Sequence, residues 1–512
     1  MRLTVKKINF ETGNTRDILL NKKDAAKLGQ KPGERIIIKD PNVSSPEKKY
    51  WVAIIHVTNS DSILAPGQIG ILADNPALIN DFAEDKELSV KPAEQPDSYR
   101  FIRKKIEGKK LNGEEINKII SDAVSGLLSR IELASFITGV SINGCDNHEI
   151  TALTMAEARS GEIFDFGPNV YDKHSTGGVP GNKVSLIIVP IVAAADLLIP
   201  KTSTRAITSP SGTADSMEVL APVKFNSNEL KEIISKENAC IAWGGALDIA
   251  PADNILIEVE RPLHLDPFGL MIPSILAKKL SMGVKKIVLD IPVGSGTKFP
   301  TPEEGDKFAH KFKEIGRNVG VEAECALTLA HQPIGHAIGP AIEAKEALTL
   351  LKDYSAGPNS LIEKSTSLAG ILLEMGGKAQ KGKGQELAKN ILKSGEAYEK
   401  MRKIIEAQKG NPDIEPEEIE LGPYSKDFYS TKSGHITEVN NAIINQIAKT
   451  AGCPYSKTAG VEIFKKQGAK IEEGELIFRI YSNSKSKLRK AEKVYNATGS
   501  PIILGGMMIK RI

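Results

Sequence analysis

This chain of 512 residues has little of what marks several large protein classes. Its four cysteines are scattered singly and form no CxxC pair, which excludes a disulfide scaffold and predicts a reducing, cytoplasmic compartment. Aromatic residues make up 5%, too few for the stacking surfaces that bind single-stranded nucleic acid. The longest apolar run, residues 186–195, contains Pro190 and is far shorter than the roughly 20 residues of a membrane helix, and the N-terminus has no apolar signal core.

An excess of one charge is also missing. Lys and Arg number 67 and Asp and Glu 64, so the net charge is +3 and a nucleic-acid-binding surface is not expected. Small anionic ligands fit this balance, because they need only a local pocket. With 41% hydrophobic residues the composition is that of a soluble globular protein, and the length predicts roughly three or four domains.

Hydropathy patterns separate a β-rich start from a helical stretch. Residues 1–90 contain short β-branched runs at 35–39 and 51–57 between turn-rich segments, which predicts a β-rich module. In the next stretch, to about residue 160, Asn112 and Asp146 are each followed by an acid three residues on and then by apolar residues at helical spacing. This pattern predicts two helix N-termini.

The rest of the chain predicts a mixed fold. From about residue 165 to 425, apolar strands alternate with helical stretches, which indicates a mainly parallel α/β sheet. Residues 426–512 are typical of short strands joined by tight turns. The expected strands of the α/β part are 184–189, 286–290 and 321–327, and its expected helices are 302–315 and 384–392.

The most informative stretch is DKHSTGGVPGNKVS, residues 172–185, directly before an apolar run. Glycines let the backbone approach a ligand and expose its N–H groups. Such groups, together with Lys173 and the hydroxyl of Ser175, suit an oxyanion or a phosphate. The stretch lacks the GxxxxGK[ST] pattern of a P-loop, and an ordinary turn is the alternative interpretation.

A second polar stretch, residues 201–215 (KTSTRAITSPSGTAD), crowds hydroxyl side chains around Arg205. Arginine is the planar phosphate binder among the side chains, and hydroxyls can donate to further phosphate oxygens. Two such stretches could supply two anion sites. Helix capping is the alternative, because Ser and Thr favour cap positions.

Asp266 is a candidate general acid. It precedes Pro267 in apolar surroundings, and a partly desolvated carboxyl can have a raised pKa. An Asp-Pro turn or a helix cap explains the same residues.

Further lysines and histidines carry weaker signals. Ser274, Lys278 and Lys279 fall on an expected helix, for which a solvated lysine face is the simpler interpretation. Residues 294–298 (GSGTK) form another Gly-rich loop after an expected strand. No metal is expected, since no further ligands are suitably spaced around His331 and His336.

Together these stretches resemble the thymidine/pyrimidine nucleoside phosphorylase family, with KHSTGG at 173–178 as the specific match. An additional N-terminal module and TRAITS at 204–209 resemble the archaeal branch that acts on nucleoside 5′-monophosphates. The supporting matches are collinear: IRKK at 102–105, EEI at 114–116, SGT at 211–213, SILAKK at 274–279, VGSG at 293–296 and QPIG at 332–335.

The resemblance implies an α/β multidomain fold. A helical domain packs across a cleft from a mainly parallel α/β domain, with a small β-rich N-terminal domain and a small α+β C-terminal domain. A homo-oligomer, either a dimer or a larger assembly, is also implied. The implied bounds are 1–90 for an N-terminal oligomerisation module, 98–165 plus 250–282 for the helical domain, 166–249 plus 283–425 for the phosphate-binding α/β domain, and 426–512 for the C-terminal domain.

The implied reaction is phosphorolysis, in which AMP and phosphate give adenine and ribose 1,5-bisphosphate, with CMP and UMP as further expected substrates. Inorganic phosphate is a co-substrate and no cofactor is expected. Bound phosphate would stabilise the oxocarbenium-like sugar. Asp266 would protonate the departing base, with His174 as a site-lining residue. The matching positions are Lys173, Ser175, Ser185 and Ser203 for inorganic phosphate, and Gly178, Thr204, Arg205, Ala206, Ile207, Thr208, Ser209, Thr213, Ser274 and Lys298 for the nucleotide.

One departure bears on the substrate. Thymidine phosphorylases carry an arginine that reads the pyrimidine ring where this chain has Val259. That change and the hydroxyl-rich 204–209 favour a phosphorylated substrate, for which Arg205 and Lys298 are chemically suited. Three alternatives stay open: a pyrimidine nucleoside phosphorylase, a phosphoribosyltransferase of a related fold, and a nucleotide-binding protein with an inert site.

Overall fold

The computed structural model of the chain describes residues 1–13, 16–41, 50–206 and 209–505. Its contacts divide into two compact units, Met1–Ser160 with Ala250–Ser274, and Gly161–Ile249 with Ile275–Ile512. The chain leaves the first unit at Ser160, returns to it at Ala250 and leaves again at Ser274. Both units are therefore built from separate stretches of sequence.

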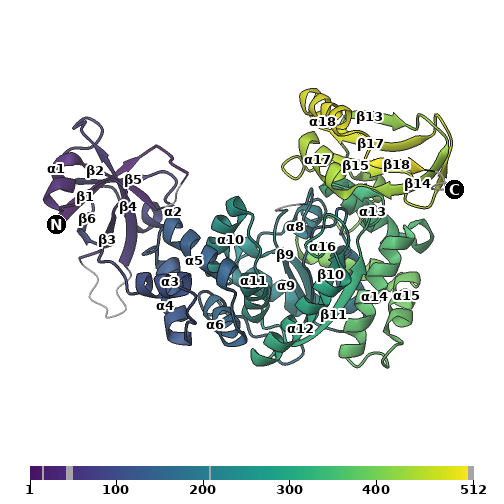
Figure 1. Cartoon of the computed structure of the whole chain (residues 1–512), viewed down its shortest axis with the longest axis horizontal. Helices are drawn as coiled ribbons and strands as arrows, with labels where there is room; N and C mark the ends of the chain where they lie inside the picture. The colour runs from purple at the N-terminus through teal and green to yellow at the C-terminus, as the bar shows by residue number, and fades with distance from the viewer. Residues whose placement is uncertain (14–15, 42–49, 207–208, 506–512) are drawn as a thin grey trace. The chain divides into compact units, whose positions relative to one another are not determined.

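The N-terminal part of the first unit is a closed six-stranded barrel, drawn in purple in Figure 1. Its elements are β1 (Arg2–Ile8), β2 (Asp17–Asn21), α1 (Lys22–Lys27), β3 (Arg35–Lys39), β4 (Tyr50–Thr58), β5 (Gln68–Leu72), α2 (Pro76–Asp81) and β6 (Glu87–Pro92). The strand order is β1-β5-β2-β4-β3-β6, and closure leaves no free sheet edge. The predicted strands 35–39 and 51–57 are confirmed as β3 and β4, with Ile36 and Ile38 turned into the core.

The remainder of the first unit is a helical bundle. Its helices are α3 (Ser98–Ile106), α4 (Gly113–Ser125), α5 (Arg130–Asn143), α6 (Asn147–Ala158), α10 (Pro251–Leu263) and the start of α11 (Phe268–Ser281). The predicted N-termini at Asn112 and Asp146 are confirmed. Each side chain accepts the backbone N–H of the third helical residue, and the glutamate at that position accepts the backbone N–H of the cap residue. Leu256 of α10 joins the apolar cluster of α4 and α5, which fixes residues 250–274 in this unit.

A buried ion pair crosses this bundle. Lys105 Nζ lies 2.7 Å from Glu149 Oε1, and both side chains are 3% exposed. The same oxygen accepts the backbone N–H of Leu111 at 3.0 Å. One cation thus faces one carboxylate, whose remaining hydrogen-bonding capacity is partly used by the backbone.

The second unit is built on parallel strands. They are β7 (Tyr171–Ser175), β8 (Ile199–Ser203), β9 (Ala239–Trp243), β10 (Lys286–Val293) and β11 (Glu322–Leu329). β10 pairs in parallel with both β7 and β11, and β8 pairs in parallel with β9. A parallel bridge between Val170 and Leu198 joins the two groups. The predicted parallel sheet and its strands 286–290 and 321–327 are confirmed, and all five strands end at one edge.

Helices cover this sheet. They are α7 (Ser185–Ala194), α8 (Thr213–Met217), α9 (Ser227–Glu237), α12 (Pro302–Asn318), α13 (Pro340–Lys352), α14 (Asn359–Met375), α15 (Gly384–Lys393) and α16 (Glu396–Ala407). The expected helices 302–315 and 384–392 are confirmed as α12 and α15. α12 packs on β11 and β10, and α14 packs on β10.

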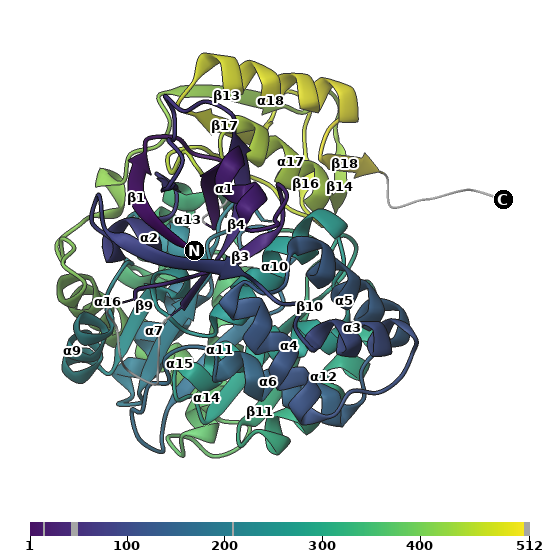
Figure 2. The ribbon, with the colours of Figure 1, turned by 90° about the vertical axis from the view of Figure 1, so that its left-hand side faces the viewer.

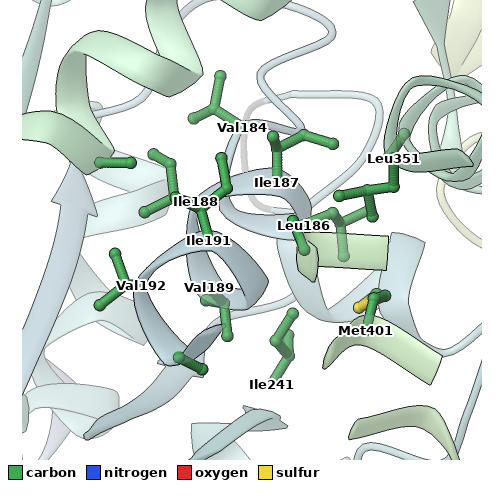
Figure 3. Packing of buried hydrophobic residues seen from close by; sticks show 14 of the residues in the cluster. Val184, Leu186, Ile187, Ile188, Val189, Ile191, Val192, Ile241, Leu351 and Met401 are labelled. Atoms are coloured by element: carbon green, nitrogen blue, oxygen red, sulfur yellow. The ribbon is translucent and has the colours of Figure 1, made fainter. Parts of the chain in front are cut away.

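The expected strand over 184–189 is wrong, because these residues open α7. Nine of the ten residues of α7 are buried. Figure 3 shows Leu186 and Ile188 among the side chains of this helix, with Ile241, Leu351 and Met401 from other elements packed around them. A continuous apolar run cannot distinguish a buried strand from a helix that is covered on all sides, and here α14 and α16 supply that cover.

The C-terminal module, residues 424–505, combines two small sheets with two helices. Its elements are β13 (Tyr424–Tyr429), β14 (Gly434–Val439), α17 (Asn441–Ala451), β15 (Gly460–Ile463), β16 (Lys470–Ile471), β17 (Leu476–Ser482), α18 (Lys485–Thr498) and β18 (Ile502–Gly505). One of its sheets also includes β12 (Ala337–Ile338), a short strand from outside the module. The sheets run β12-β15-β17-β13 and β16-β14-β18. Figure 2 shows α18, in yellow, beside β13 and β17. Because β12 belongs to the α/β chain segment, its pairing with β15 joins the module to the α/β domain.

The predicted fold class is confirmed in its parts: a β-rich N-terminal domain, a helical bundle, a parallel α/β domain and an α+β C-terminal module. Within the described residues, no helix is both long and apolar enough to cross a membrane.

Candidate functional site

Three polar loops follow the carboxyl ends of strands in the parallel sheet. Residues 176–184 follow β7, 204–212 follow β8 and 294–298 follow β10. In open parallel sheets this edge is where ligands bind. A Cβ at Gly178, where φ is +90°, would lie 3.1 Å from the Cα of Thr297 and 3.3 Å from the backbone nitrogen of Lys298. Glycine is thus needed at 178, and the structure brings the predicted residues Gly178 and Lys298 together.

One face of β7 carries Asp172, a carboxylate shared by two buried lysines. Lys279 Nζ of α11 lies 2.5 Å from Asp172 Oδ2, and Lys201 Nζ of β8 lies 3.5 Å from Oδ1. Lys201 also donates to the carbonyl oxygen of Lys173 at 2.8 Å. The interpretation of 274–279 as a solvated lysine face is wrong for Lys279, which is 2% exposed because α11 packs it over the sheet.

The other face of β7 carries Lys173, since side chains alternate along a strand. Lys173 Nζ lies 3.6 Å from Asp290 Oδ2, and Lys364 Nζ of α14 lies 3.0 Å from the same oxygen. Thr328 donates to Asp290 Oδ1 at 2.6 Å, and Asn182 donates to Ser175 Oγ at 3.1 Å. A second carboxylate is therefore shared by two buried lysines, beside the hydroxyl of Ser175.

The two clusters hold more cations than carboxylates: four lysines share Asp172 and Asp290. Burial lowers the pKa of Lys173 to about 8 and that of Lys201 to about 7, against the pull of the carboxylates. Burial would raise the pKa of Asp290, but Lys364 and Lys173 hold that pKa at about 2. Such a surplus of desolvated positive charge is stabilised by a bound anion.

The same surroundings act on His174, which lies on β7 beside Lys173. Burial and then the charges of Lys279 and Lys201 hold the pKa of His174 well below 6.5. Its imidazole is therefore neutral at neutral pH, which makes it a poor proton donor and a good hydrogen-bonding lining group.

The Gly-rich loop leads into the N-terminus of α7, with Ser185 as its first residue, 3% exposed. A helix N-terminus adds partial positive charge. The N–H groups of Leu186 and Ile187 already donate to the carbonyls of Lys183 and Val184. Two buried oxygens of this loop, Thr176 Oγ1 and Asn182 Oδ1, have no hydrogen-bond partner among the described residues. The loop thus has polar capacity that its own fold leaves unused.

The hydroxyl-rich loop is held by acids. Arg205 donates to both carboxylate oxygens of Glu218 at 2.7 Å and to Asp215 Oδ1 at 3.1 Å. Ser203 ends β8, Thr204 and Ala206 lie in the loop, and Thr213 opens α8. Ser209 donates to the carbonyl of Ser211 at 2.8 Å. The predicted site residues Ile207 and Thr208 lie outside the described residues.

Two predicted residues belong to the first unit. Ser274 is half-buried in α11, and Asp266 lies between α10 and α11. The expected apolar surroundings of Asp266 are a wrong prediction for this structure, since the side chain is exposed. The helices on either side of it bury Val259 and Leu270, but the connection between them stays at the surface. The role of Asp266 stays a prediction.

Sequence reasoning missed the lysines that complete the clusters. Lys364 lies in a helix far along the chain from KHSTGG, and no local signal marks it. Lys201 and Lys279 lie in polar stretches of the sequence, but the carboxylate that they share, Asp172, follows only from the packing of strands and helix. No three His, Cys, Asp or Glu side chains in the described parts of the chain are grouped to hold a metal ion.

Family sequence models match most of the second unit and the bundle. The glycosyl transferase family a/b domain matches residues 167–398, and the glycosyl transferase family helical bundle domain matches 99–161. The pyrimidine nucleoside phosphorylase C-terminal domain matches 435–500. All three loops of the candidate site lie within the first of these matches.

Curated relatives cover nearly the whole chain. AMP phosphorylase of Thermococcus kodakarensis is 46% identical over 97% of this chain and 96% of the relative. AMP phosphorylase of Methanocaldococcus jannaschii is 45% identical over the same shares, and that of Pyrococcus furiosus is 44% identical over 100% of this chain and 99% of the relative.

A solved structure shares the fold of part of this chain. Anthranilate phosphoribosyltransferase from Thermus thermophilus aligns with a TM-score of 0.52 at 20% identity, over 60% of this chain and 99% of that one. At this identity the likeness concerns the fold alone.

Proposed function

The chain belongs to the AMP phosphorylase family, and on that premise we propose that it cleaves nucleoside 5′-monophosphates by phosphorolysis. AMP and inorganic phosphate give adenine and ribose 1,5-bisphosphate, and CMP and UMP are further substrates. The observation that carries the proposal is the surplus of buried lysines at the carboxyl edge of the sheet. It is a site for a compact, multiply charged anion.

Inorganic phosphate occupies the Gly-rich side of this edge. Lys173 supplies charge, Ser175 and Ser185 supply hydroxyls, and the N-terminus of α7 supplies partial positive charge. Ser203 adds a hydroxyl from the end of β8. Phosphate held this way stabilises the positive charge that develops at C1′ of the ribose as the base departs.

The nucleotide occupies the loops beside it. Lys298, next to Gly178, supplies a cation for the 5′-phosphate. Arg205 already donates to two carboxylates, so its contribution is to the shape of the loop. The hydroxyl-rich residues 204–209, Thr213 and Ser274 complete the proposed binding set.

Asp266 donates the proton that the departing base needs, the role that the family resemblance of its segment implies. Asp266→Asn is expected to lower kcat roughly 10²-fold or more, with the KM for phosphate unchanged. A near-normal kcat would move proton donation to His174 or to solvent.

The enzyme works without a cofactor, as a homo-oligomer in the cytoplasm. Self-association is supported by an apolar hollow along α3 and α5, where Ile106 is 50% exposed and Ile131 and Ile142 are each 77% exposed. Exposed apolar patches of this kind mark contact surfaces. Light scattering of Ile131→Glu against the parent chain tests this, because the charged variant is expected to have a lower mass.

The function is tested by base release from AMP and from adenosine in parallel, with and without inorganic phosphate. Phosphate-dependent release of adenine from AMP, with little from adenosine, is expected. Release mainly from unphosphorylated nucleosides would instead assign the chain to the nucleoside phosphorylases. No release from AMP, CMP, adenosine or uridine would contradict phosphorolysis altogether.

A further inference from the structure

One carboxylate closes the described part of the hydroxyl-rich loop. Asp215 Oδ2 accepts the backbone N–H of Ala206 at 2.7 Å and that of Gly212 at 3.0 Å. The two ends also touch, because a Cβ at Gly212 would lie 2.8 Å from the nitrogen of Ala206. The positions of Ala206 and Gly212 therefore depend on where Asp215 is held.

Arg205 ties this carboxylate to a second one. Its guanidinium bridges Asp215 and Glu218, and it lies over the ring of Trp243 with 4.9 Å between the guanidinium carbon and the ring centroid. The bidentate pairing and the stacking leave the guanidinium one preferred pose. Trp243 is the last residue of β9, so its backbone is held by the sheet.

The second carboxylate is held from the C-terminal module. Lys457 Nζ lies 2.9 Å from Glu218 Oε2, the oxygen that also accepts from Arg205. The backbone carbonyl of Lys457 accepts the N–H of Ala341 at the start of α13. The pKa of Glu218 is lowered to about 2 by Arg205 and Lys457 together, against its partial burial. The carboxylate therefore stays charged across the working pH range.

A second contact places the same module at a neighbouring loop. Asn441, the first residue of α17, donates to the carbonyl of Ala330 at 2.8 Å. Its Cβ is 4.0 Å from a Cβ built on Gly296, within the GSGTK loop. The C-terminal module thus contacts the surroundings of two of the three loops of the candidate site.

We propose that Lys457 and Glu218 are positioning residues for nucleotide binding: the C-terminal module, through this pair, fixes Arg205 and Asp215 and thereby the positions of Ala206 and Gly212. The inference rests on the proposed function, which gives that loop to the nucleotide. Neither residue touches substrate. Their effect is on nucleotide affinity and not on phosphate affinity, because the buried lysine clusters involve neither residue.

The first test separates positioning from ordinary surface pairing, which contributes little to stability. Lys457→Ala is expected to raise the KM for AMP about fivefold to tenfold, with kcat and the KM for phosphate within about twofold. Lys457→Arg is expected to restore the KM for AMP, and Glu218→Gln to reproduce the loss. The matched control is Lys426→Ala, since Lys426 is similarly exposed in the same module and pairs at 3.3 Å with Glu492, an acid outside the loop.

A spectroscopic readout does not depend on turnover. The chain has two tryptophans, so Trp51→Phe leaves Trp243 as the single emitter. In that background Lys457→Ala is expected to change the emission of Trp243 without any ligand, because Glu218, which holds the stacked Arg205, loses its lysine partner. Lys426→Ala is expected to leave the emission as it was.

The outcomes separate the two proposals. An unchanged KM for AMP and unchanged Trp243 emission in Lys457→Ala would overturn the inference while AMP cleavage by the parent chain stands. An emission change in a parent chain that cleaves only nucleosides would reject the nucleotide function but keep the coupling between module and loop. Equal losses in the KM for AMP and for phosphate would reduce Lys457 to a general structural role and overturn the inference.

Discussion

The buried lysine of the helical bundle and those at the carboxyl edge of the sheet are arranged on opposite principles. In the helical bundle, Lys105 and Glu149 match one to one. At the carboxyl edge of the sheet, four lysines share Asp172 and Asp290, and burial lowers the pKa of Lys173 and of Lys201. Removing one partner of a matched pair leaves an unpaired charge, whereas an uneven cluster gains when a further anion arrives. The first arrangement serves the fold, and the second is the proposed anion site.

The largest effect is expected from breaking the matched pair. Lys105→Met leaves Glu149 buried without its cation and should lower the free energy of unfolding of the bundle by about 3–5 kcal/mol. Denaturant unfolding measures this, with Lys109→Met as the control because its ion pair with Glu107 is exposed. A loss no larger than that of the control, or a raised KM for phosphate in folded protein, would break the comparison.

Removing one lysine from the uneven cluster should affect the ligand and not the fold. Lys173→Ala leaves Asp290 paired with Lys364, so the unfolding midpoint should move less than in Lys105→Met. The KM for phosphate is expected to rise about tenfold to 10²-fold, which corresponds to the roughly 1.5–3 kcal/mol that a hydrogen bond to a charged group contributes. Steady-state kinetics against phosphate checks it, and an unchanged KM would remove Lys173 from the phosphate site.

The KM for phosphate is expected to change with pH by up to about tenfold per pH unit. Because the pKa of Lys173 is lowered to about 8, the lysine of the free enzyme loses its proton as the pH rises above that value. In the complex with phosphate, the lysine keeps its proton to a higher pH. The KM for phosphate should therefore rise above about pH 8, and phosphate binding should take up a proton there. Calorimetry in two buffers of different ionisation enthalpy measures the uptake. A KM that stays flat to about pH 9 would contradict the lowered pKa.

The smallest effect sharpens that result. Lys364 is one of the charges that lower the pKa of Lys173, after burial itself. Lys364→Met should therefore move the alkaline rise of the KM upward by about one pH unit or less. It should also raise the KM at neutral pH, by less than Lys173→Ala does. A downward move would mean that Lys364 supports the charge of Lys173 instead of opposing it.

What could be predicted from the sequence follows the range of the interactions. Helix caps at Asn112 and Asp146 are local, and their spacing alone predicts them. The Gly-rich stretch and the parallel sheet are also predictable, because strand, loop and helix follow one another in the chain. The partner of Lys364 and the burial of Lys279 depend on packing between distant segments, which no local pattern carries.

The errors have the same cause. Residues 184–189 have a pattern that fits a buried strand or a buried helix, and only the surrounding helices decide between the two. The neighbours of Asp266 in sequence are apolar, but its chain segment turns outward between two helices. Arg205 has the chemistry of a phosphate ligand, but its guanidinium donates to Asp215 and Glu218, ten and thirteen residues further along the chain. The sequence pattern does not show that these acids are its partners.

The burial of α7 also sets an order of folding. This apolar helix, residues 185–194, is synthesised early, yet α14 and α16, which cover it, lie at 359–375 and 396–407. During synthesis its side chains have no native partners until much later parts of the chain emerge, so the α/β half cannot complete its core one segment at a time. The barrel, whose strands are all within the first 92 residues, has no such delay. Refolding should accordingly show an early barrel phase and a slow phase that ends with the closure of α14 and α16 over α7.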